Sequence, residues 1–85
     1  MNARGKIAPT LLRWAQDQGA VNVKRVEILG IPKQQEMANY VGLTRETFKR
    51  VLAELENDGF IDKSDVQKIV IENFPEFKKI FGPFY

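Results

Sequence analysis

Four charged side chains between positions 45 and 50 have the chemistry needed to recognise the edges of base pairs. An arginine guanidinium can donate two parallel hydrogen bonds to guanine O6 and N7, which suits Arg45 and Arg50. The carboxylate of Glu46 can accept a hydrogen bond from the cytosine amino group, and a surface that only held phosphates would have no reason to carry it. Lys49 can reach a base or a phosphate, and its position does not decide between them.

These side chains share one face if residues 45–57 form a helix. At about 100° per residue the charged set spans about 140°, and the apolar set falls between about 240° and 340°. The charged set is Arg45, Glu46, Lys49 and Arg50, and the apolar set is Phe48, Val51, Leu52 and Leu55. Such a helix can dock its apolar side on a domain and place its N-terminal half in a major groove. On an isolated helix the same charged face is more often simply solvated, so the surrounding sequence has to decide.

The residues before this helix favour the DNA interpretation, because they predict a helix-turn-helix over about 33–57. Ala38 is small where two crossing helices would touch, and Gly42 can supply the positive φ of a tight turn. Thr44 is a suitable N-cap for a helix at 45–57, which Asp58 and Gly59 would end. The apolar side chains expected to face inward are Met37, Val41, Leu43, Phe48 and Val51.

Several polar side chains around this motif are candidates for contacts with the DNA backbone. Hydroxyl groups near the start of a helix, together with free backbone amides, suit a phosphate. The candidates are Thr44 and Thr47, Gln34 and Gln35 at the start of the preceding helix, and Lys63 and Ser64 in a later turn, with Lys33 and Lys68 as weaker ones.

The chain before the motif predicts a helix and then a strand. Residues 4–18 carry apolar side chains at helical spacing, and Pro9 is tolerable there only if the helix begins next to it or its first turn is loosely formed. We expect Trp14 in the core rather than as a stacking platform. Residues 21–29 alternate imperfectly between apolar and charged types, which favours a short half-buried strand. Pro32 suits the first turn of the next helix.

The chain after the motif predicts a β-hairpin and a short apolar helix. The hairpin, or wing, would cover about 60–72, with arms at 60–61 and 66–72 and a polar tip at 62–65. The phenylalanine-rich tail has helical spacing and is expected to pack back onto the domain: Phe74, Phe77, Ile80, Phe81 and Phe84. The predicted class is α+β, mainly α: a winged helix-turn-helix with a three-helix core, forming one domain over residues 1–85.

The composition excludes several function classes. The chain of 85 residues has no cysteine and no histidine, which removes disulfides, thiol chemistry, the commonest general base and the commonest transition-metal ligand. Its eleven acidic residues are scattered, and no pair has an apolar setting that would separate two pKa values. We therefore expect no enzyme, no metal and no cofactor. No long apolar run or signal-peptide pattern is present, so we expect a cytoplasmic protein with no membrane partner.

The string VGLTRETFKRVL at 41–52 closely resembles the signature of the Crp/Fnr family, named for the cyclic-AMP receptor protein and the fumarate and nitrate reduction regulator. Residues 4–15 look like the first helix of the family's C-terminal domain, and 55–61 with 66–71 look like its wing. The resemblance covers roughly residues 4–73. The string itself is specific, whereas the other pieces are weak alone.

The resemblance implies sequence-specific binding of double-stranded DNA in bacterial transcription regulation. The full-length protein would be a homodimer that reads a palindrome with two recognition helices about one turn apart, with RNA polymerase as a further partner. In that family the positions of Arg45, Glu46 and Arg50 read bases, which favours a half-site with a GTG-like core. Lys49 replaces a residue that is often small, and Lys33 replaces the hydroxyl residue that usually caps the second helix.

Family members ordinarily carry an effector-sensing β-roll and a long dimerisation helix before this domain, and 85 residues hold neither. We favour a DNA-binding domain cut from a longer regulator over a naturally short relative, because Met1–Ala3 leads almost at once into the first helix. A rival interpretation is a winged-helix protein-interaction or dimerisation module that uses the phenylalanine-rich tail and the first helix. A carboxylate hydrolase would need a concave acidic pocket, which the pattern does not suggest.

Overall fold

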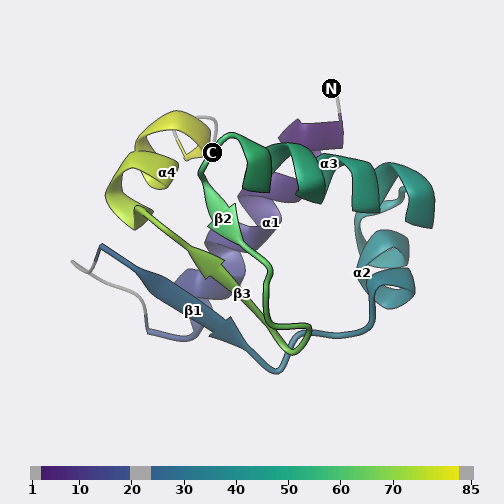
Figure 1. Cartoon of the computed structure of the whole chain (residues 1–85), viewed down its shortest axis with the longest axis horizontal. Coiled ribbons are helices and arrows are strands. Elements are labelled where there is room, and N and C mark those ends of the chain that lie inside the picture. Colours follow the sequence, from purple (N-terminus) through teal and green to yellow (C-terminus); the bar gives the residue numbers. More distant parts are fainter. Residues whose placement is uncertain (1–2, 20–23, 83–85) are drawn as a thin grey trace.

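A computed structural model describes residues 3–19 and 24–82, and in these ranges the chain forms four helices and one three-stranded antiparallel sheet (Figure 1). The order along the chain is α1 (Ala3–Asp17), β1 (Val26–Leu29), α2 (Gln34–Val41), α3 (Arg45–Asn57), β2 (Ile61–Asp62), β3 (Lys68–Ile71) and α4 (Phe74–Phe81). This mainly helical arrangement confirms the predicted winged helix-turn-helix.

The third helix begins and ends where the sequence predicted, over Arg45–Asn57. The second is shifted by one residue to Gln34–Val41, and Pro32 lies outside it rather than in its first turn. The N-cap is instead Lys33. Its backbone is extended, at φ −62° and ψ 153°, and its side chain makes no capping hydrogen bond. Helix α2 therefore starts without the hydroxyl cap that a serine or threonine would give.

Pro9 lies inside α1, so the prediction that the helix would begin next to it, or with a loose first turn, was wrong. A proline in a helix interior costs about 3 kcal/mol because it removes a backbone donor and crowds the preceding turn. The apolar face continues on both sides of it, however, since Ile7, Ala8 and Leu11 are all buried. Burial of large aliphatic side chains, at about 1.5 to 3 kcal/mol each, is of a size to offset that cost.

The strand order is β1-β3-β2, so the middle strand is the second arm of the wing. Val26 pairs with Ile71 on one edge of β3, and Ile61 pairs with Ile71 on the other. The pairing of β1 with the wing was not foreseen from the sequence. Positions 21–23 of the predicted strand at 21–29 lie outside the described residues, and among the described positions 24–29 the strand covers Val26–Leu29.

The second arm of the wing is shorter than predicted, because it begins at Lys68 and not at Val66. Val66 is 82% exposed and lies in the turn. Asp65 causes the difference: its Oδ1 accepts a hydrogen bond from the amide of Gln67 at 2.8 Å, so the turn continues to that residue. The first arm is likewise displaced by one residue, to Ile61–Asp62.

The core lies between the helices and one face of the sheet. Buried side chains from every helix and strand contribute to it, among them Leu11, Ile28, Met37, Phe48, Leu55, Ile61, Ile69 and Phe77. Trp14, expected in the core, is half-buried at its edge, where its ring centre is 5.7 Å from that of Tyr40.

The tail packs back onto the domain as α4, which lies against α1. Asn73 caps it by accepting a hydrogen bond from the amide of Glu76 at 3.2 Å. Phe74 and Phe77 are buried and Phe81 is half-buried, whereas Ile80 is 39% exposed; Phe84 lies outside the described residues. The ring of Phe60, from the start of the wing, meets those of Phe77 and Phe81 at centre distances of 6.2 and 5.4 Å. The tail therefore belongs to the core of the domain.

No helix in the described part of the chain is long and apolar enough to cross a membrane.

Candidate nucleic-acid interface

The turn between α2 and α3 fixes how the two helices cross. Gly42 has φ 74° and ψ 33°, a left-handed conformation that confirms the predicted positive φ. The amide of Leu43 then donates to the carbonyl of Ala38 at 2.9 Å, which closes the end of α2 in a Schellman arrangement. Ala38 is completely buried at this crossing, as its size predicted.

The start of α3 is held by the hydroxyl of Thr44. Its oxygen accepts from the amide of Thr47 at 3.2 Å, so the predicted N-cap is confirmed. The same hydroxyl donates to Thr47 Oγ1 at 2.9 Å. Thr44 is thereby occupied in both directions, and the hydroxyl proton of Thr47 is the one left to donate outward.

The two faces of α3 are separated as the helical wheel predicted. Phe48, Val51, Leu52 and Leu55 are buried, and the four charged side chains Arg45, Glu46, Lys49 and Arg50 are exposed. Within residues 3–19 and 24–82, Arg45, Glu46 and Lys49 make no hydrogen bond or ion pair through their side chains. They are therefore free to bond to a ligand in front of α3.

Arg50 differs from these three because its Nη1 donates to Glu54 Oε2 at 2.8 Å, one helical turn further on. The other oxygen of Glu54 lies 3.6 Å from Nη2 of Arg4, in α1. Sequence reasoning did not single out Glu54 or Arg4. The spacing of Arg50 and Glu54 at i,i+4 was a signal that could have identified the first of them.

The candidate phosphate-binding residues on α2 lie at its N-terminal end. Gln34 is half-buried, and the amide nitrogen of Gln35 donates to Asn39 Oδ1 at 3.0 Å along the same helix. Side-chain amide N–H groups and the free backbone amides at a helix start are polar groups of the kind that bind phosphate oxygens.

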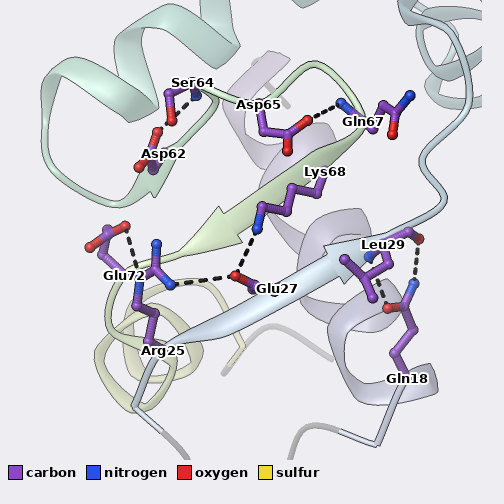
Figure 2. Close-up of polar contacts among 10 residues, drawn as sticks. All are labelled: Gln18, Arg25, Glu27, Leu29, Asp62, Ser64, Asp65, Gln67, Lys68 and Glu72. Carbon is purple, nitrogen blue, oxygen red and sulfur yellow. Dashed lines mark hydrogen bonds and ion pairs between the residues drawn. The ribbon is translucent and has the colours of Figure 1, made fainter.

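The wing candidates Lys63 and Ser64 are held by carboxylates. The backbone amide of Lys63 donates to Glu56 Oε2 at 2.9 Å, and partial burial lowers the pKa of the Lys63 side chain despite the opposite effect of Glu56. Figure 2 shows Ser64 beside Asp62, whose Oδ1 accepts from the Ser64 amide at 2.8 Å. The amide and hydroxyl of Ser64 hold the pKa of Asp62 below its ordinary 3.8. A phosphate bound at Ser64 would therefore lie close to a negative charge.

The candidate residues thus form two groups. The first comprises the residues at the start of α2 and in the first half of α3: Gln34, Gln35, Thr44, Arg45, Glu46, Thr47, Lys49 and Arg50. The second group is Lys63, tied through Glu56 to the last turns of α3, and Ser64, bonded to Asp62 in the wing. The weaker candidate Lys68 is bonded to Glu27 at 2.9 Å on the outer face of the sheet (Figure 2).

A comparison with protein families identifies this arrangement. The family model described as a Crp-like helix-turn-helix domain matches residues 5–80. No curated protein sequence matches the chain.

Solved structures have the same fold. The CO-dependent transcription factor CooA from Carboxydothermus hydrogenoformans is 20% identical, with a TM-score of 0.78 over 92% of this chain and 36% of that one. Oxidised CprK in complex with o-chlorophenolacetic acid is 25% identical, with a TM-score of 0.79 over 99% of this chain and 35% of that one. The OCPA-complexed C200S form of CprK is 28% identical, with a TM-score of 0.77 over 94% of this chain and 38% of that one. The chain spans 36% of the length of CooA and 35% of that of CprK.

Proposed function

The chain belongs to the Crp-like helix-turn-helix family of DNA-binding transcription regulators, and we propose that it reads specific bases of double-stranded DNA with α3 in the major groove. The observation that carries this proposal is the unpaired state of Arg45, Glu46 and Lys49 on the exposed face of α3. These three side chains keep their donors and acceptors for a ligand in front of α3.

The donor and acceptor groups suggest which bases are contacted. Arg45 and Arg50 match guanine, and Glu46 matches the amino group of cytosine. The resemblance of 41–52 to the Crp/Fnr signature, in which these positions read bases, favours a half-site with a GTG-like core. Lys49 lies on the same face and reads a fourth position or holds a phosphate.

The groups at the helix starts support a role in fixing the register of the protein on the duplex. Thr47 keeps a hydroxyl proton for a phosphate, and Gln34 and Gln35 lie at the start of α2. Lys63 and Ser64 in the wing would reach the backbone of the flanking DNA. Phosphate contacts of this kind raise affinity for every sequence alike and depend on salt.

The chain spans about a third of the solved regulators that share its fold, so we propose that it acts as the DNA-binding part of a longer regulator. In a homodimer two copies of α3 would enter successive major grooves of a palindrome. A single copy should bind weakly, because it lacks the second half-site and the effective concentration that a dimer gives. RNA polymerase would then be a partner of the whole regulator.

The burial of the tail weighs against the rival use of the domain as a protein-interaction module. Phe74 and Phe77, which such a module would expose, are 4% and 0% exposed. Among the large apolar side chains of α4, Ile80 is 39% exposed and Phe81 is half-buried. This leaves a small apolar area compared with the patches that mark protein interfaces.

Selection of bound duplexes from a random pool tests the proposal directly. We expect an enriched half-site that contains guanine at two positions, together with its preferred spacing. A pool that stays random after several rounds, while binding falls steeply with salt, would show backbone binding without base reading.

A further inference from the structure

Glu54 lies between two arginines that come from different helices. Its Oε2 accepts from Arg50 Nη1 at 2.8 Å, and its Oε1 is 3.6 Å from Arg4 Nη2. The same Arg4 nitrogen donates to Asp58 Oδ2 at 2.9 Å. The four side chains therefore form a continuous chain of charge contacts that runs from the first turn of α1 to the exposed face of α3.

The positions of Arg50 and Glu54 on α3 explain why both lie close to Arg4 of α1. At about 100° per residue Arg50, Glu54 and Asp58 follow one another along the edge between the exposed and the buried face. Helix α1 packs against α3 here, and Ala3, Arg4, Arg50, Val51 and Glu54 line a shallow hollow of about 180 Å³. Because side chains on a helix lean towards its N-terminus, the carboxylate of Glu54 leans towards Arg50.

The bond to Glu54 leaves Arg50 able to contact a base. A guanidinium carries five N–H donors, and the structure uses Nη1 of Arg50 for Glu54. The donors on Nε and Nη2 remain for the two acceptors of guanine. Since a long side chain loses rotamer freedom when it binds, an arginine that is already held in place loses less.

We propose that Glu54 and Arg4 are positioning residues for base recognition: Glu54 orients the Arg50 guanidinium towards the groove, and Arg4 holds Glu54 in place. The inference rests on the proposed base-reading function and extends it to two residues outside the exposed face. In consequence α1, which lies behind the helix-turn-helix, contributes to the preference for one base pair.

A bond between Glu54 and Arg50 could also keep Arg50 away from DNA, and that outcome would overturn the inference. If the Glu54 carboxylate instead withheld Arg50 from DNA, its removal would increase affinity for the guanine-containing site more than for other sequences. If the bridge were only a surface ion pair, removing it would change the affinity for all sequences by the same factor, because one negative charge is lost.

The test uses the whole 85-residue chain and the duplex that this chain selects from a random pool. Arg50→Ala first identifies the base pair at which the preference depends on Arg50. Affinity is then measured by fluorescence anisotropy for the selected duplex and for three duplexes that differ from it only at that base pair. We expect Glu54→Gln to reduce the preference for the selected base about two- to fivefold, the range of exposed ion pairs, while affinity for unrelated DNA rises. Glu56→Gln is the matched control, since it removes an equal charge from the same helix and keeps an acceptor for the Lys63 amide. It should leave the preference unchanged.

Arg4→Gln tests the second step. It should reduce the same preference by a smaller factor, and it should have no further effect in a chain that already carries Glu54→Gln, because Arg4 acts through Glu54. Thermal unfolding of each variant confirms that it is folded at the temperature of the measurement. An unchanged or increased preference in Glu54→Gln overturns the inference and leaves base reading intact. Failure of the wild-type chain to select any sequence overturns the proposed function and the inference with it.

Discussion

At the scale of single residues, the exposed face of α3 combines free and held side chains. Arg45, Glu46 and Lys49 have no partner among the described residues, whereas Arg50 is bonded to Glu54. The helical wheel located all four on one face, because the angle between residues of a helix is a local property. It could not reveal that Arg50 is linked to Arg4, since that contact depends on how α1 crosses α3.

Alanine at either Arg50 or Glu46 should weaken binding to the selected duplex by about 1 to 3 kcal/mol and relax the preference at one base pair, because one specific donor or acceptor set is lost. Binding to duplexes with single base changes measures both effects. Lys79→Ala, a charge loss on the exposed surface of α4, is the control. An equal loss on every sequence would contradict a base-reading role.

Gly42→Ala should destabilise the fold by about 1 to 2 kcal/mol, because a side chain is strained at φ 74°. Nothing within 4 Å would meet the added methyl group, so the cost comes from the backbone alone. Urea unfolding measures it. Gly42→Asn should cost less, since asparagine tolerates the left-handed region better. Equal losses in the two variants would point to a cause other than backbone strain.

At the scale of elements, the sequence predicted the features that neighbouring residues determine and not those that depend on distant segments. Helix α3 was located correctly because Thr44 caps it and Gly59, with φ 84°, follows its end. The wing was misplaced at Val66, since the apolar side chain suggested a strand while the carboxylate of Asp65 formed a turn. The pairing of β1 with β3 joins segments far apart in the chain, and alternation of residue types alone does not specify a partner strand.

The outer face of the sheet makes the stability of the domain depend on pH. Lys68 lowers the pKa of Glu27 below its ordinary 4.5 through a hydrogen bond and its charge, and Arg25 adds to the effect (Figure 2). Because the pKa of Glu27 is lower in the folded chain, its contribution to stability is present above the pKa of the unfolded chain. It is lost as the pH falls through the pKa of the folded chain.

The free energy of unfolding should thus decrease on acidification from about pH 5 to pH 3, and it should decrease less in Glu27→Gln. Urea unfolding at a series of pH values measures the slope. Lys68→Met should reduce the slope as well, and identical slopes in wild type and Glu27→Gln would exclude the mechanism.

At the scale of the whole molecule, a chain of this length buries a limited core and depends on each large side chain in it. Helix α4 supplies two of them, Phe74 and Phe77. Its helical spacing and its return to the domain could be predicted from the pattern of phenylalanines, but not the aromatic cluster with Phe60, which brings together residues separated by the wing.

Phe77→Ala should destabilise the domain by about 3 to 5 kcal/mol, because the side chain is completely buried and leaves a cavity. That loss is a large part of the about 5 to 15 kcal/mol by which small domains are stable. Unfolding in urea, followed by circular dichroism, measures it. Ile80→Ala, at a position 39% exposed on the same helix, should cost clearly less. Similar losses in both variants would mean that α4 is not anchored through Phe77.

The ladder between β1 and β3 has a mechanical consequence. Its register places Val26 opposite Ile71, at the end where the chain enters β1 and leaves β3. Tension that reaches the chain where it enters β1 and leaves β3 would therefore load this end of the ladder first and separate the pairs one after another. The segment with α2 and α3 lies wholly inside the closed loop, between Leu29 and Lys68. Tension transmitted from attached segments would have to separate the β1–β3 pairs before it could stretch the turn at Gly42.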